Sequence, residues 1–173
     1  TYGPRMRPQD GRVITTFIAQ ALNGDPLTIY GDGSQTRSYC YVDDLIRGII
    51  FMIESTEVGP INLGTQFELS VFDLASLILK IIGSDSFLEY HPLPTDDPTR
   101  RRPVLTRAEE CLGWRPQVSI EEGLRRMVDW FRSRLDEVAA ARSAISGRQL
   151  DGIPMAPAWP WQNSVDQYAS SDQ

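Results

Sequence analysis

The segment of residues 30–44 constrains the fold more than any other part of the chain. It reads Tyr-Gly-Asp-Gly-Ser-Gln-Thr-Arg-Ser-Tyr-Cys-Tyr-Val-Asp-Asp. The two glycines predict a tight turn, and the aromatic residues of 38–42 predict a strand. Asp43 and Asp44 stand where residues that cap a helix belong. Because Arg37 lies isolated between the turn and the strand, the segment is typical of an anion-binding loop.

Apolar residues at helical spacing alternate with short β-rich runs along most of the chain. This order predicts an α/β fold. The helix that follows the aromatic run is apolar over most of its surface, which predicts that it is well buried. Helices are expected over residues 13–22, 44–53, 71–82, 106–112 and 120–135, and strands over residues 27–30, 38–42, 61–63 and 87–91.

The composition argues against nucleic acid and membrane partners. The formal net charge is -6 over 173 residues, so the chain as a whole repels nucleic acid and anionic membranes, and an anion site must be built locally. No apolar run reaches the roughly 18 to 20 residues that span a bilayer, so we expect no membrane contact by this segment. Cys40 and Cys111 are too few for a disulfide framework or a zinc site, which suggests a reducing, cytoplasmic compartment.

The sequence lacks three patterns that would indicate dinucleotide binding, a catalytic pair or a metal site. No glycine-rich dinucleotide fingerprint follows a strand and opens a helix. Lys80 has Ser76 four residues before it, so there is no Tyr-x-x-x-Lys pair. His91 is the single histidine and has no second metal ligand near it in sequence. We therefore expect no catalytic residue and no metal in this chain.

Several short motifs follow one another along the chain. In order, they are Tyr2-Gly-Pro-Arg, Asp10-Gly-Arg-Val, the loop of residues 30–44, Ile61-Asn-Leu-Gly, Asp96-Asp-Pro and Leu112-Gly-Trp-Arg-Pro. This series resembles the C-terminal half of extended short-chain dehydrogenases that act on nucleotide sugars, most of all the UDP-glucuronate decarboxylase family. The resemblance covers residues 1–135, and the composition of residues 136–173 predicts a helix extension with a mostly disordered tail.

This resemblance implies a fold, a reaction and partners. The fold would be the C-terminal substrate-binding lobe of an extended short-chain dehydrogenase, with the Rossmann-type NAD half missing. In that family the sugar C4 hydroxyl is oxidised on bound NAD, CO2 leaves, and the hydride returns to give UDP-xylose. The resemblance thus implies an upstream N-terminal Rossmann half as partner and a homodimer for the parent. The parent would be cytoplasmic, or at the Golgi membrane if an anchor precedes it, and this chain alone would be inactive.

The resemblance also assigns roles to residues of this sequence. Thr1 matches a residue near NAD. Tyr30 and Gln35 match positions beside the nucleotide, and Arg37 and Arg101 match ligands of the diphosphate. The part that lines the sugar-nucleotide pocket is expected to contain Arg12, Ile14, Thr15, Thr16, Phe17 and Ile18.

Two alternatives remain open. A nucleotide-sugar 4,6-dehydratase or 4-epimerase shares the glycine turn and Arg37, although Arg12 favours the decarboxylase, whose carboxylate substrate needs an additional positive group. The chain could instead be a non-catalytic ligand-binding module, because the expected catalytic groups are absent from it. In isolation Arg37 would also pass for an ordinary surface arginine.

Overall fold

The computed structural model describes residues 1–7, 11–94 and 100–146. The chain divides into two units, Thr1–Arg132 and Ser133–Gln173. In the described ranges, no helix combines the length and the apolar character that crossing a membrane requires. The elements are α1 (Val13–Asn23), β1 (Leu27–Tyr30), β2 (Thr36–Arg37), α2 (Val42–Glu54), β3 (Leu69–Ser70), α3 (Val71–Ile82), β4 (Leu88–His91), β5 (Arg100–Arg101), α4 (Thr106–Leu112) and α5 (Ile120–Ser146).

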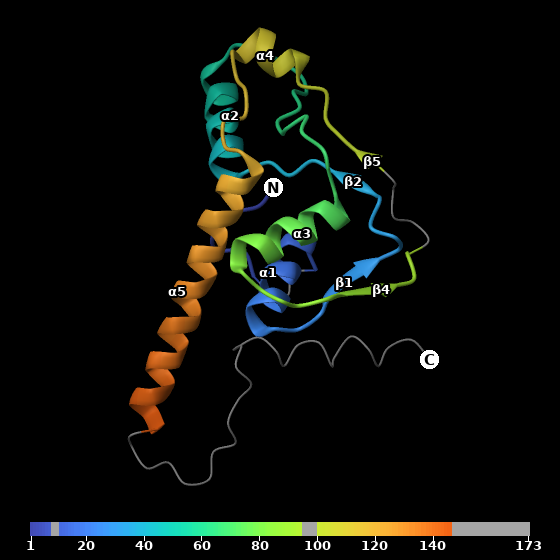
Figure 1. The fold of residues 1–173 in the computed structure, drawn as a ribbon. Coiled ribbons are helices and arrows are strands. Elements are labelled where there is room, and N and C mark those ends of the chain that lie inside the picture. The colour runs from blue at the N-terminus through green and yellow to red at the C-terminus, as the bar shows by residue number, and fades with distance from the viewer. Residues whose placement is uncertain (8–10, 95–99, 147–173) are drawn as a thin grey trace, which may run out of the picture. The chain divides into compact units, whose positions relative to one another are not determined.

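Helices α1 and α3 pack together beside a parallel pair of strands, β1 and β4 (Figure 1). Leu27 pairs with Leu88 and Tyr30 with His91. Both helices end as their sequences predict, since Gly24 and Gly83 adopt the left-handed conformation that glycine adopts without strain. The core between these elements is made of the buried side chains of Ile14, Phe17, Ile18, Leu27, Ile29, Leu74 and Ile78.

A second, three-stranded sheet has the order β3-β2-β5. β2 runs antiparallel to β3 and parallel to β5, so that Thr36 pairs with Arg100 and Arg37 with Arg101. Figure 1 shows this sheet at the end of the β1 and β4 strands where the chain leaves β1 through the glycine turn. The sheet therefore brings the loop around Arg37 next to the arginine run that begins at Arg100.

A buried carboxylate joins α2 to the segment before α5. Asp44 is fully buried and accepts hydrogen bonds from the backbone N–H groups of Gln117 at 2.9 Å and Val118 at 2.8 Å. Arg47 donates to its other oxygen at 2.7 Å. The Trp114 indole N–H donates to the Asp44 carbonyl at 3.1 Å, and that ring forms a core with Leu105 and Ala108 of the α4 region.

Three predictions about the segment after Arg37 are wrong. The strand lies at residues 36–37 and not 38–42; beyond it, Tyr41 forms only an isolated parallel bridge with Tyr2. Asp44 lies in the first turn of α2 with its side chain turned to the Gln117 backbone, so it does not cap the helix. The apolar face of α2 is not buried: Ile46, Ile49, Ile50 and Ile53 are 50%, 40%, 46% and 76% exposed.

Helix α5 begins where the sequence predicts and extends further. Ser119 Oγ accepts from the backbone N–H of Glu122 at 3.2 Å, as expected of a helix cap. The helix continues to Ser146, beyond the expected end near residue 135. Early in the helix, a Cβ atom at Gly123 would collide with the Tyr2 ring and lie 2.8 Å from Tyr41, so this glycine allows both rings to approach. The predicted disordered tail lies outside the described residues, apart from the end of α5.

Candidate functional site

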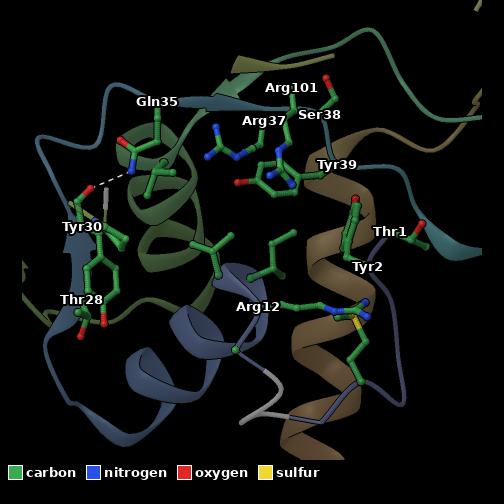
Figure 2. A pocket seen from close by; sticks show the side chains of 16 residues that line it. Thr1, Tyr2, Arg12, Thr28, Tyr30, Gln35, Arg37, Ser38, Tyr39 and Arg101 are labelled. Carbon is green, nitrogen blue, oxygen red and sulfur yellow. Dashed lines mark hydrogen bonds between the residues drawn. The ribbon is translucent and has the colours of Figure 1, made fainter. Parts of the chain in front are cut away.

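A pocket of about 730 Å³ opens between α1, the glycine turn and the three-stranded sheet (Figure 2). Its size suits a ligand as large as a nucleotide. Seven predicted site residues line it, namely Thr1, Arg12, Ile14, Tyr30, Gln35, Arg37 and Arg101. The other lining residues are Tyr2, Met6, Gly11, Val13, Thr28, Ser38, Tyr39, Val71 and Pro94.

The glycine turn shapes one wall of the pocket. Gly31 and Gly33 have φ of 72° and 77°, which an L side chain would make strained. Between them Asp32 accepts from the backbone N–H of Ser34 at 2.9 Å and from its hydroxyl at 2.7 Å, and these bonds lower the pKa of Asp32. The backbone N–H and hydroxyl groups of Ser34 thus stabilise the turn itself. The turn leaves Tyr30 half exposed at the pocket wall.

The polar residues that flank Arg37 differ in their hydrogen-bond partners. The Gln35 amide lines the pocket but donates to the Tyr30 carbonyl at 2.8 Å, a bond that holds the two ends of the turn together (Figure 2). The Thr36 hydroxyl donates to Glu68 at 2.9 Å and is directed away from the lining. Ser38 Oγ is buried with no hydrogen-bond partner among the described residues. The polar wall of the pocket therefore depends mainly on arginines.

Arg37 and Arg101 are neighbours in the parallel pairing of β2 and β5, and both line the pocket. Figure 2 shows their side chains together on the side formed by this sheet. Planar guanidinium groups bind carboxylates and phosphates through paired hydrogen bonds. This side of the pocket is therefore a candidate anion site.

Arg12 lies on a different side of the pocket, at the residue before α1. Figure 2 shows its side chain extending away from the Arg37 and Arg101 pair. Its carbonyl accepts from the hydroxyls of Thr15 at 2.7 Å and Thr16 at 3.1 Å, which fixes the start of the helix. The pocket thus has cationic groups on two sides.

The structure does not bring four of the predicted residues to the pocket lining. Thr15 and Thr16 direct their hydroxyls to the Arg12 carbonyl along the helix. Phe17 and Ile18 are 1% and 0% exposed in the core. They follow Ile14 on α1, and only the first turn of this helix faces the pocket.

Sequence reasoning missed the aromatic residues Tyr2 and Tyr39 of the lining. The Tyr2 hydroxyl donates to the Ile120 carbonyl at 3.3 Å. Burial, reinforced by neighbouring Tyr41, raises the pKa of Tyr2, so it stays a neutral phenol and is unsuited to accept a proton. Tyr2 belongs to a motif quoted above, but the motif gave no sign that its ring would reach the pocket.

Among the residues that the structure describes, no group of three or more potential ligands could hold a metal ion. The acidic loop of Asp96 and Asp97 lies outside the described residues.

Comparison with known proteins corrects the predicted fold class. The model of the NAD dependent epimerase/dehydratase family matches residues 1–64, which indicates that NAD-binding region is present in this α/β chain. The prediction of a C-terminal substrate-binding lobe whose Rossmann-type NAD half is missing is therefore wrong. The glycine fingerprint occupies only the first strand-to-helix turn of a dinucleotide-binding fold, so its absence did not exclude later parts of that fold.

Among solved structures, the chain is similar to sugar-nucleotide 4-epimerases. UDP-glucose 4-epimerase of Thermotoga maritima, solved with UDP-glucose, has a TM-score of 0.75 and 37% identity, over 78% of this chain and 44% of that one. UDP-glucuronic acid 4-epimerase of Bacillus cereus, in complex with UDP-glucuronic acid and NAD, has a TM-score of 0.72 and 33% identity, over 77% of this chain and 43% of that one.

The curated relatives point to a narrower group. UDP-glucuronic acid decarboxylase 1 of Arabidopsis thaliana is 45% identical over 135 residues, which are 78% of this chain and 31% of the relative. UDP-glucuronic acid decarboxylase 1 of Danio rerio is 43% identical over 139 residues, 80% of this chain and 33% of the relative. The chain therefore spans about a third of the length of these relatives. It is a homologue of the UDP-glucuronic acid decarboxylases, and its residues 1–64 match the NAD dependent epimerase/dehydratase family.

Proposed function

We propose that residues 1–135 form the nucleotide-sugar-binding region of a NAD-dependent UDP-glucuronate decarboxylase, which converts UDP-glucuronate to UDP-xylose and CO2. The observation that carries this proposal is the pair of Arg37 and Arg101, held in register at one side of a nucleotide-sized pocket. Homology to the decarboxylases supports the choice of reaction.

The pocket offers a separate group to each part of such a substrate. Arg37 and Arg101 bind the diphosphate, because adjacent guanidinium groups suit two neighbouring phosphates. Tyr30 and Gln35 lie beside the nucleotide. Arg12, on a different side of the same pocket, binds the sugar carboxylate. The residues therefore position the substrate through both of its charged groups, the diphosphate and the sugar carboxylate.

The residues of this chain would position the substrate, and NAD would supply the oxidation of sugar C4 and the return of the hydride after CO2 leaves. Thr1 lines the same pocket and is the residue that we propose to contact NAD. Loss of CO2 requires that the carboxylate be held without being neutralised by proton transfer. A guanidinium suits this role because it stays protonated and donates only hydrogen bonds.

Isothermal titration of the chain with UDP tests the binding part of the proposal. We expect binding that weakens about tenfold or more in Arg37→Ala and in Arg101→Ala, since each loses a charge-assisted contact. Arg115→Ala serves as the matched control, because Arg115 is 72% exposed, pairs with Glu109 and does not line the pocket. Absence of UDP binding by the unaltered chain would refute the proposed site.

The reaction itself is tested with the complete protein that contains this chain. UDP-glucuronate should give UDP-xylose and CO2 in equal amounts when NAD is present. The 173-residue chain alone should bind UDP without this turnover, because the Tyr-x-x-x-Lys pair of the family does not occur in it. Turnover by the chain alone would refute that last expectation and leave the binding site intact.

A 4-epimerase is the second candidate, and the similarity to two UDP-sugar 4-epimerase structures favours it. Epimerisation would retain the carboxylate and invert C4, so the product would keep the mass of UDP-glucuronate and no CO2 would form. Mass analysis of the product therefore separates the two reactions. Binding of UDP by a complete protein that carries out neither would favour a non-catalytic module.

A further inference from the structure

Glu68 gathers side chains from two strands of the three-stranded sheet. It lies one residue before β3, and its Oε1 atom accepts from the Thr36 hydroxyl of β2 at 2.9 Å and from Arg100 Nε of β5 at 2.7 Å. A second Arg100 nitrogen contacts Oε2, and Arg102 Nε lies 3.5 Å from the same atom. One carboxylate thus connects all three parts of the sheet.

These contacts divide the run of three arginines between two sides of the chain. Successive side chains of an extended segment alternate in direction. Arg100 and Arg102 turn to Glu68, while Arg101 between them lines the pocket beside Arg37. The partners of the two outer arginines therefore fix the direction of the middle one.

The backbone alone holds this arrangement weakly. β2 and β5 are each two residues long, so their pairing supplies few hydrogen bonds. A side-chain contact that ties β5 to β2 adds to this pairing, because it holds the strands together through side chains that do not line the pocket.

We propose that Glu68 is a positioning residue of the anion site: by holding Thr36 and Arg100, it keeps Arg101 beside Arg37 for a diphosphate. The inference rests on the proposed function, since it assigns the pair to a diphosphate. Glu68 does not itself line the pocket. Its side chain is 17% exposed, far less than the 60% of Arg100, which is consistent with an anchor shared by several donors.

An ordinary surface ion pair would contribute little, so the test must detect an effect that passes through Arg101. A double-mutant cycle does this. UDP affinity is measured by titration calorimetry for the unaltered chain, Glu68→Gln, Arg101→Ala and the double variant. Glu57→Gln is the matched control, because it removes the same charge from an exposed pair with Arg107 and does not line the pocket.

The direction of the change separates positioning from plain charge. Removing a negative charge should by itself strengthen the binding of an anion. We expect Glu68→Gln instead to weaken UDP binding about tenfold, and to change it less than about twofold in the Arg101→Ala background. Thr36→Val removes one hydrogen-bond donor to Glu68 without altering charge, and should weaken UDP binding about threefold. This variant replaces Glu68→Gln in the test if Glu68→Gln does not fold.

Each outcome decides between the proposals. Unchanged or tighter UDP binding in Glu68→Gln and unchanged binding in Thr36→Val overturn the positioning role, as does an equal loss with and without Arg101. In those cases the proposed function stands, because the unaltered chain still binds UDP. Failure of the unaltered chain to bind UDP overturns the proposed function and this inference with it.

Discussion

Arg37 and Arg101 form a candidate site because two strands place them together. Each is a common kind of residue, and Arg37 also donates to the Thr36 carbonyl at 2.9 Å. The parallel register of β2 and β5 puts both residues at one side of the pocket. In the proposed function, these two residues contribute to substrate binding rather than to bond breaking.

Arg37→Ala in the complete protein should therefore raise KM for UDP-glucuronate about ten- to hundredfold and lower kcat much less. The reason is that the diphosphate is held equally in the ground state and the transition state. Arg37→Lys should give an intermediate KM, because an ammonium keeps the charge but loses the paired geometry. Steady-state kinetics measures both constants. A fall in kcat at unchanged KM would show that Arg37 takes part in the chemical step.

Asp44 offers a prediction about stability at the same scale. Asp44→Ala leaves the buried N–H groups of Gln117 and Val118 without an acceptor, which should lower the free energy of unfolding by about 2–4 kcal/mol. Asp43→Ala is the control, since that side chain is 69% exposed and lies 3.8 Å from Arg126. Urea denaturation measures both variants. Equal losses of unfolding free energy in the two variants would mean that the Asp44 carboxylate stabilises the protein only through its negative charge at the start of α2.

The role of a single residue could be predicted where the sequence pattern that identifies it is short and local. Arg37 could be found from the sequence because it follows a glycine turn. Glu68 could not be found, because its partners are Thr36 and Arg100, each 32 positions away. The sequence placed Asp44 at a helix start. Its carboxylate, however, accepts a hydrogen bond from the Gln117 backbone, more than 70 residues later, and no local pattern reveals such a distant contact.

At the scale of elements, the sequence predicted which helices exist better than what covers them. Helical spacing located α1 and α3, and glycines located their ends. The same spacing located α2, but its isoleucines are exposed, because burial depends on a covering element that periodicity does not show. Strands β2, β3 and β5 are two residues long, too short for an alternating pattern, and the sequence predicted none of them correctly.

The three-stranded sheet should lose an electrostatic contribution in acid. Hydrogen bonds from Arg100 lower the pKa of Glu68 from 4.5 to about 2. Because the folded pKa is the lower one, the contribution is complete above the unfolded pKa near 4.5 and is lost as the pH falls toward 2. The difference in unfolding free energy between the unaltered chain and Glu68→Gln should shrink over this interval. A difference that stays constant from pH 6 to pH 3 would contradict the assignment.

At the scale of the whole molecule, homology corrects the predicted division of the chain. The family model reaches residue 64, which includes α2. Motif order was sufficient to recognise the decarboxylase homologues, because it uses many short signals together. The same motifs could not locate the division between NAD-binding and substrate-binding regions. That division was inferred only from the absence of one glycine motif.

The exposed isoleucine face of α2 predicts how the chain behaves in solution. Ile46, Ile49, Ile50 and Ile53 lie at spacings of three and four residues, so they form one continuous apolar stripe. A contiguous exposed apolar surface favours self-association. We therefore expect the chain to be poorly soluble and to show, by light scattering, a mass that increases with concentration.

The double variant Ile49→Glu with Ile53→Lys should reverse this behaviour. It breaks the stripe, keeps the net charge at -6 and places an acidic residue four positions before a basic one, which supports the helix. The control is Val58→Lys with Val104→Glu, which removes two exposed apolar side chains outside α2. Only the α2 variant should approach monomer mass, with UDP affinity unchanged because these isoleucines do not line the pocket. An unaltered chain that stays monomeric at high concentration and melts in one sharp transition would show that the stripe is tolerated as it stands.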